Sequence, residues 1–238
     1  AETGTMISFS EIVIYSVWIT QKSRMRMRSG FLLIHDYLFT LSNTCELFMN
    51  LLHSIYPQKL HRGKRMEKIQ YENLTIHQAE ASDAKQLAAW WNDGAVMAHA
   101  GFPNGVGTTE AEVIKGLGKG SLVIEEDHRL IGECNYYPVA QGVAEIGIKI
   151  CEPDGQNRGV GRKILSMLIG RLFESGYSKI ILDTNLKNTR AQHVYESLGF
   201  RKVRTNVDAW KDQLGQLQSS IDYELIEKDF ISYINHKL

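Results

Sequence analysis

A strand, a glycine-rich turn and an amphipathic helix follow one another in the middle of the sequence, and they constrain its fold more than any other segment. Residues 143–151 alternate in polarity, with isoleucine at positions 146, 148 and 150, as expected of a strand. The turn reads QNRGVGR over Gln156–Arg162, and the helix that follows ends near Glu174 with its apolar residues at helical spacing. A chain of this kind folds with helices packed on a sheet.

The sequence from Met66 onward supplies further elements of such a layered structure. The predicted elements are, in order, a strand at 74–79, a helix at 82–91 capped by Ser82, a helix from the capping box at Thr109 to 117, strands at 121–125 and 129–136 joined by a turn at Asp127-His128, a strand at 143–151, a helix at 159–174, a strand at 179–184, a helix at 189–198, and strands at 200–207 and 222–227. A polar and helix-compatible stretch at 210–217 bridges the last two strands. This order predicts a mixed α/β fold, neither doubly wound nor all-β.

The composition excludes several classes of function. The formal net charge is zero, which argues against a nucleic-acid or a membrane partner. The sequence has no run of 18 apolar residues, so we expect no transmembrane helix. Cys45, Cys134 and Cys151 are an odd number of cysteines without CxxC spacing, which predicts reduced thiols in a cytoplasmic protein and no metal site.

The first 65 residues differ from the rest of the sequence. Residues 1–5 read as a vector remnant ahead of Met6. Residues 6–65 form an N-terminal extension. Residues 1–65 together have eight basic and four acidic residues, whereas residues 66–238 have 19 and 23. Two interpretations stay open for this extension: a translated leader ahead of a natural start at Met66, or an amphipathic helix over 31–55 that packs on the domain or on a second subunit. We assign residues 66–238 to the main domain.

The turn Gln156–Arg162 is the densest chemical signal. Glycine lets a backbone approach a ligand closely, and the first amides of a helix point outward at the positive end of its dipole. Such a turn can hold a diphosphate, with Arg158 and Arg162 adding positive charge. It matches neither the Walker loop nor the GxGxxG fingerprint. By itself it is equally well explained as a tight strand-to-helix turn.

A second segment, NTRAQHVYESLGF, runs from Asn188 to Phe200. Together the two segments resemble the GNAT acetyltransferases: Gln156-x-x-Gly159-x-Gly161 is similar to the acetyl-CoA loop of that family, and Asn188-x-x-Ala191-x-x-x-Tyr195-x-x-x-Gly199-Phe200 to its C-terminal motif. The resemblance covers nearly all of 72–227. It implies the GNAT acyl-CoA N-acyltransferase fold, a mostly antiparallel twisted sheet flanked by helices, in which the parallel strands 143–151 and 179–184 splay apart.

The resemblance also implies a reaction, the acetyl-CoA-dependent acetylation of a primary amine by direct attack in a ternary complex. Backbone amides from Asn157 through Arg162 would bind the diphosphate, and pantetheine would pair with the strand edge at Ile148–Ile150. Asn188 would hold the pantetheine arm, and Tyr195 would protonate the departing thiolate. The implied cofactor-binding residues are Ile148, Ile150, Gln156, Asn157, Arg158, Gly159, Val160, Gly161, Arg162 and Asn188.

A reacting amine must be neutral although an alkyl amine has a pKa of about 10.4, so a general base is useful. Glu145 and Glu133 are the candidates, because both lie on strands expected to line the acceptor side. His99, on a loop, is a third. For each of the two carboxylates a surface role is an equally good explanation. Asn188 has an alternative as a helix cap, and Tyr195 as a core aromatic residue.

The acceptor stays open between a peptide, a lysine, a polyamine, an amino sugar and an antibiotic. Trp90-Trp91-Asn92-Asp93 is similar to the first helix of the branch that holds ribosomal-protein alanine and aminoglycoside acetyltransferases. An aminoglycoside-modifying acetyltransferase is therefore one alternative. A non-catalytic acyl-CoA-binding regulatory module is a second alternative, from another class of function. The glycine-rich loop 102–107 is a candidate acceptor-side lid. A homodimer is expected from the family alone.

Overall fold

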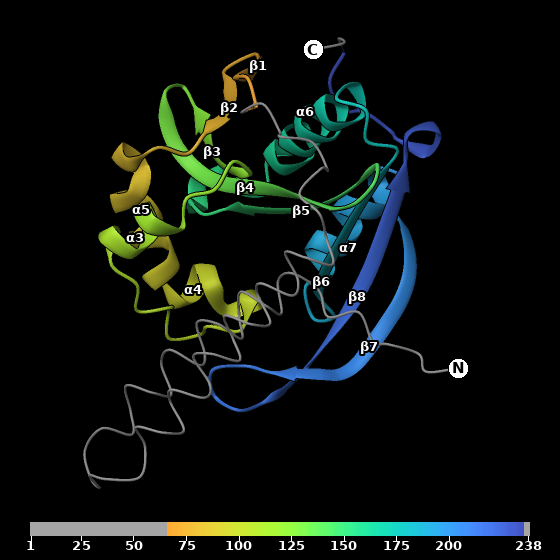
Figure 1. Ribbon diagram of the computed structural model, residues 1–238. Coiled ribbons are helices and arrows are strands. Elements are labelled where there is room, and N and C mark those ends of the chain that lie inside the picture. Colours follow the sequence, from red (N-terminus) through yellow and green to blue (C-terminus); the bar gives the residue numbers. More distant parts are fainter. Residues whose placement is uncertain (1–65, 236–238) are drawn as a thin grey trace, which may run out of the picture. The chain divides into compact units, whose positions relative to one another are not determined.

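A computed structural model describes residues 66–235, so the vector remnant and the extension predicted for residues 1–65 lie outside the described residues. Eight strands of the described chain form one sheet in the order β1-β2-β3-β4-β5-β6-β8-β7 (Figure 1). The strands are β1 (Ile69–Tyr71), β2 (Leu74–Gln78), β3 (Ser121–Glu126), β4 (Arg129–Ala140), β5 (Val143–Ile150), β6 (Lys179–Asn185), β7 (Arg201–Lys211) and β8 (Leu217–Ile226). All neighbours are antiparallel except β5 and β6, so the expected mixed α/β sheet is confirmed.

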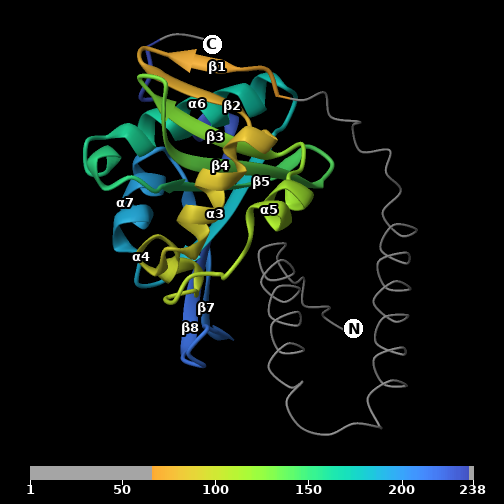
Figure 2. The same ribbon diagram turned by 90° about the vertical axis from the view of Figure 1, so that its left-hand side faces the viewer.

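Helices cover both faces of this sheet. They are α3 (Ala84–Asn92), α4 (Gly94–Met97), α5 (Glu110–Gly116), α6 (Val160–Glu174) and α7 (Thr189–Ser197). The main core lies on the face that carries α6, whose buried side chains pack with Ile146 and Cys134 from the sheet. A smaller core on the opposite face joins α3 and α5 to Val123, and Figure 2 shows α3 and α5 on the side of the sheet away from α6. No helix of the described chain is long and apolar enough to cross a bilayer.

The two parallel strands part soon after they meet. Residue pairing between β5 and β6 runs from Val143 with Lys179 to Glu145 with Ile181 and stops there. Both strands continue, β5 to Ile150 and β6 to Asn185. The second half of β5 therefore has an edge without a neighbouring strand, and the predicted splay is confirmed.

Several predicted boundaries are close to those observed. The capping box at Thr109 is present, since its hydroxyl accepts from the Glu112 amide at 3.3 Å and the Glu112 carboxylate accepts from the Thr109 amide at 2.8 Å. The turn between β3 and β4 places Asp127 at φ 51° and His128 at φ 64°, as a two-residue hairpin turn requires. Both features are local, which is why the sequence specifies them.

Two local predictions were wrong. Ser82 does not cap α3: it lies inside a 3₁₀ turn over Ala81–Asp83, where the Asp83 carboxylate accepts the Glu80 amide at 2.8 Å. The stretch 210–217 is not helical, because β7 extends to Lys211 and β8 begins at Leu217, giving a long hairpin. Figures 1 and 2 show this hairpin extending beyond the other strands.

Candidate active site

The turn before α6 presents main-chain donors to open space. Asn157 at φ 60° and Gly159 at φ 80° adopt left-handed conformations that turn the chain into the helix. Within the described residues, the amides of Asn157, Arg158 and Gly159 donate to no acceptor. A Cβ added at Gly159 or Gly161 would meet no atom within 4 Å. The space over the turn is therefore free for a ligand, and the residues fit an anionic group held by amides.

The side chains around this turn are engaged with the protein. Gln156 lies between the strand and α7, because its Nε2 donates to the Ile150 carbonyl at 2.9 Å and its Oε1 accepts from Arg190 at 3.0 Å. Arg158 pairs with Glu126 at 2.5 Å. The Arg162 amide donates to the Gly159 carbonyl at 3.1 Å, and its guanidinium lies 5.0 Å from the Tyr233 ring centroid. Gln156 and one donor of Arg158 are thus occupied by the protein, whereas the main-chain amides of Asn157 through Gly159 are free within the described chain.

Ile148 and Ile150 lie on the strand edge that β6 leaves. The Cys151 amide donates to the Ile131 carbonyl on β4 at 2.8 Å, so residue 151 faces β4. Main-chain groups alternate in direction along an antiparallel strand. Ile148 and Ile150 consequently turn their main-chain groups toward the side where β6 has departed. An extended ligand can pair with this edge, apart from the Ile150 carbonyl that Gln156 already occupies.

Tyr195 lies on α7 with its ring in the main core. Its ring centroid is 5.8 Å from those of Phe200 and Tyr223, and only 7% of the residue is exposed. Its hydroxyl has no hydrogen-bond partner among residues 66–235. Burial, and then the charge of Asp183, raise the pKa of Tyr195 above its usual range. The phenol therefore keeps its proton at neutral pH, as a proton donor must.

Asn188 caps α7, as its alternative interpretation requires. The Asn188 side-chain oxygen accepts from the Ala191 amide at 3.2 Å. The side-chain amide nitrogen has no partner among the described residues and remains available to a ligand.

Glu133 and Glu145 lie on the face of the sheet away from α6, at different places. Glu133 is 8% exposed, accepts Trp91 Nε1 at 3.0 Å on each carboxylate oxygen, and pairs with Lys149 at 2.7 Å. As a base it would have to release that lysine. Glu145 is half-buried, opposite Tyr137 on β4 and beside Ile181 on β6, where β5 and β6 part. Both carboxylates therefore face the side of β5 opposite α6, and Glu145 lies nearer the point where the two strands part.

Two further side chains complete the polar face of β4 and β5. Lys149 stands directly opposite Glu133 in the strand register. Asn135 covers Gly147, because its side-chain oxygen lies 3.0 Å from where a Cβ would be. The sequence prediction omitted Asn135 and Lys149, although the antiparallel register of strands 129–136 and 143–151 would have paired them with Gly147 and Glu133.

The loop after α4 is held by the tip of the β7–β8 hairpin. Gln213 donates its amide to the Gly101 carbonyl at 2.8 Å and its Nε2 to the Gly105 carbonyl at 2.9 Å, and its Oε1 accepts the Asn104 amide at 2.9 Å. The Trp210 ring fills the space beside Gly101. His99 precedes this loop in a 3₁₀ turn and is exposed. The predicted lid is thus tied to a segment more than 100 residues away in sequence.

The two described cysteines are buried. Cys134 lies on β4 and Cys151 directly follows β5. Burial raises the pKa of the Cys134 thiol above its usual range and that of Cys151 to about 12. Neither thiol forms a thiolate readily at neutral pH, which argues against a cysteine nucleophile.

The known proteins to which this chain is compared below are acyltransferases by name. The sequence matches the model of the acetyltransferase (GNAT) domain family over residues 73–201. It is 30% identical over 156 residues to the L-amino acid N-acyltransferase MnaT of Escherichia coli, an alignment that covers 60% of this chain and 85% of that protein. It is 32% identical over 99 residues to a mycothiol acetyltransferase of Cellulomonas flavigena, covering 37% of this chain but only 28% of that protein.

Solved structures share the fold at lower identity. A GNAT-family acetyltransferase from Bacillus anthracis superposes with a TM-score of 0.60 at 22% identity, over 68% of this chain and 99% of that one. The spermidine N-acetyltransferase of Vibrio cholerae, in complex with CoA and spermine, superposes with a TM-score of 0.59 at 21% identity, over 66% of this chain and 97% of that one.

Proposed function

This chain belongs to the GNAT acetyltransferase family, and we propose that its domain, residues 66–238, transfers the acetyl group of acetyl-CoA to a primary amine by direct attack. The observation that carries the proposal is the parting of β5 and β6 beside the turn of free amides. A diphosphate at the turn and an extended pantetheine arm along the β5 edge would fit these two features together. The family match and the relatives' acyltransferase names support the same reaction.

The turn and the strand edge would fix acetyl-CoA through main-chain groups. The amides of Asn157 and Gly159, with the first amides of α6, would hold the diphosphate oxygens. A β5 amide near Ile148 would donate to the thioester carbonyl and stabilise the oxyanion that forms when the amine attacks. Asn188 would donate its free side-chain amide to the pantetheine arm.

Glu145 and Tyr195 would move the protons of the reaction. The amine nitrogen forms a bond to the carbonyl carbon and loses a proton, directly or through water, to the Glu145 carboxylate. The bond from carbon to sulfur then breaks, and Tyr195 gives its phenolic proton to the departing thiolate. The Glu133 carboxylate would hold the side chains of Trp91 and Lys149 in position rather than act as the base.

The test measures thiol release from acetyl-CoA with a panel of primary amines, for the wild type and for Tyr195→Phe. We expect turnover with at least one amine and a fall in kcat of roughly 100- to 10,000-fold in the variant, the range for a lost proton donor. The Kd for acetyl-CoA should be unchanged. Tyr223→Phe is the matched control, because it removes a buried hydroxyl from the neighbouring ring. Acetyl-CoA binding without turnover on any amine would instead indicate a non-catalytic acyl-CoA-binding module.

The names of the relatives do not decide the acceptor. One of them is called an L-amino acid acyltransferase, and one structure of similar fold holds spermine. An amino acid carries a carboxylate beside its amine, whereas spermine is a polycation. The two acceptor classes would require opposite charges on the acceptor face.

A further inference from the structure

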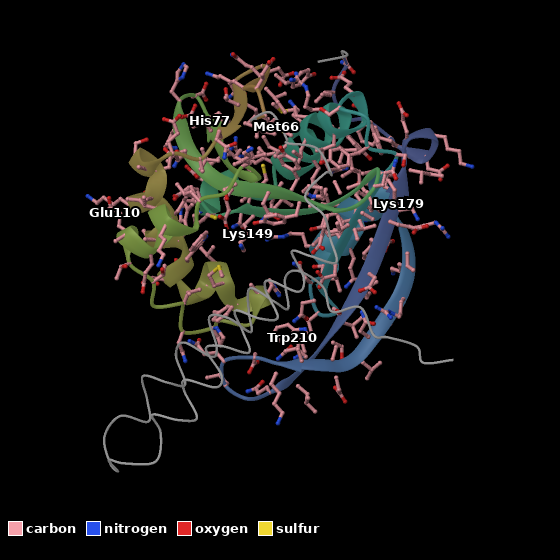
Figure 3. The ribbon with its side chains drawn as sticks, in the orientation of Figure 1. Met66, His77, Glu110, Lys149, Lys179 and Trp210 are labelled. Carbon is pink, nitrogen blue, oxygen red and sulfur yellow. The ribbon has the colours of Figure 1, made fainter. Side chains whose placement is uncertain are left out.

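Lys149 places a positive charge on the acceptor face of β5. Its ammonium lies 2.7 Å from the Glu133 carboxylate, directly across the strand pair. Figure 3 shows Lys149 on the α4 side of β5, away from α6. The side chain is 32% exposed, so solvent reaches it although its carboxylate partner is buried.

The contacts of Glu133 orient the lysine. Trp91 donates to both carboxylate oxygens, so the position of Glu133 is fixed from α3. An ammonium has three donors, and only the one on Glu133 has an acceptor among the described residues. Burial lowers the pKa of Lys149, but the charge of Glu133 and its hydrogen bond raise it by more, so the net shift is upward. The lysine is therefore charged at neutral pH with two donors to spare.

The position of this charge relative to the strand edge matters. Lys149 lies between Ile148 and Ile150, whose main-chain groups face the side that β6 has left. Glu145 lies four residues earlier on the same strand and the same face, roughly 13 Å away along the backbone. The acceptor face thus carries a cation beside the proposed thioester position and a carboxylate at the point where the strands part.

We propose that Lys149 binds a carboxylate of the acceptor, so that the acceptors are amino acids or peptides with a free carboxylate rather than polyamines. The inference rests on the proposed acetyl transfer. The carboxylate of such an acceptor accepts hydrogen bonds from the spare ammonium donors. Its amine passes its proton to Glu145 through water, because the two side chains stand roughly 13 Å apart along the strand. A polyamine or an aminoglycoside has no anion to offer and brings like charge to the lysine.

The test compares matched acceptors. Each L-amino acid of a panel is paired with the amine that remains when its carboxylate is removed, and spermidine is added as a polycation. The readout is the ratio of kcat/KM within each pair, from thiol release. We expect the wild type to prefer the carboxylate member by roughly 10- to 100-fold, the range for hydrogen bonds to a charged group. Lys149→Met should abolish that preference, and Lys149→Arg should retain it.

A second variant guards against misfolding. Lys149→Met leaves the buried Glu133 without its partner, so Lys149→Met combined with Glu133→Gln removes both charges together. Both variants are assayed for acetyl-CoA binding, and only the ratio within a pair is compared. Equal rates on both members of a pair, a preference for spermidine, or a preference that survives both variants overturns the carboxylate site while leaving acetyl transfer intact. No turnover on any amine overturns the proposed function as well.

Discussion

The proposed cofactor side and the proposed acceptor side of this domain differ in the groups they offer: main-chain groups on the first and side chains on the second. On the proposed cofactor side, main-chain amides of the turn before α6 and the open edge of β5 would provide the binding groups. On the proposed acceptor side, charged and polar side chains of β4 and β5 would do so, with Lys149, Glu133 and Trp91 in one hydrogen-bonded group. A main-chain site suits a cosubstrate that a whole family shares, whereas a side-chain site can change with the acceptor.

The largest effect on the acceptor side should come from Glu145→Gln. Loss of the proposed base should lower kcat by about 100-fold or more and leave the Kd for acetyl-CoA unchanged. Without the base, the rate should follow the neutral fraction of the amine and rise tenfold per pH unit up to the amine pKa, about 10.4 for an alkyl amine. Rates measured from pH 6 to pH 10 check this. Wild-type rates of Glu145→Gln at every pH would show that Glu145 is not the general base.

Glu133→Ala should lower the free energy of unfolding, because the acceptor side depends on side-chain contacts. It leaves Lys149 and the Trp91 indole without their acceptor. The cost should be about 2 to 3 kcal/mol, less than the roughly 3 to 5 kcal/mol for breaking a fully buried pair, because Lys149 is partly exposed. Urea denaturation measures the free energy of unfolding. Glu125→Ala, on the neighbouring strand, is the control and should cost much less, because the partly exposed Glu125 carboxylate lies 3.4 Å from Nε2 of His77.

The smallest effect should come from Gln213→Ala at the hairpin tip. The variant removes two side-chain hydrogen bonds to the loop at Asn104 and Gly105. These bonds are at or near the surface, so the loss should be about 1 kcal/mol. Faster amide hydrogen exchange at Asn104, with unchanged exchange at the Val113 amide in α5, would show that the hairpin holds the loop. Equal exchange at Asn104 in the variant and the wild type would show that the hairpin does not hold the loop.

The cofactor side was largely predictable from the sequence and the acceptor side was not. The turn Gln156–Arg162 and the helix after it are consecutive in the chain, so glycine spacing and helical periodicity indicate their geometry. Lys149 and Glu133 come together only through the register of β4 and β5. Gln213 reaches a loop more than 100 residues away, and local patterns carry no information about such a contact.

The elements that the sequence did not predict correctly also depend on contacts between strands or on turn closure. The stretch 210–217 is polar and helix-compatible in sequence, but Asp212 accepts the amides of Leu214 and Gln216, each at 2.9 Å, and closes a hairpin turn. Strand β1 was not predicted, because its three residues are too few for periodicity and depend on pairing with β2.

Gly161→Val tests whether main-chain groups at the start of α6 hold the cosubstrate. A Cβ at Gly161 meets open space, as it does at Gly170 further along the same helix, so Gly170→Val is a matched control for stability. The measurement is the Kd for acetyl-CoA by calorimetry. We expect Gly161→Val to fold as stably as Gly170→Val and yet to bind acetyl-CoA at least about 100-fold more weakly, because its side chain occupies the space that the diphosphate needs. Equal affinity in the two variants would contradict this expectation.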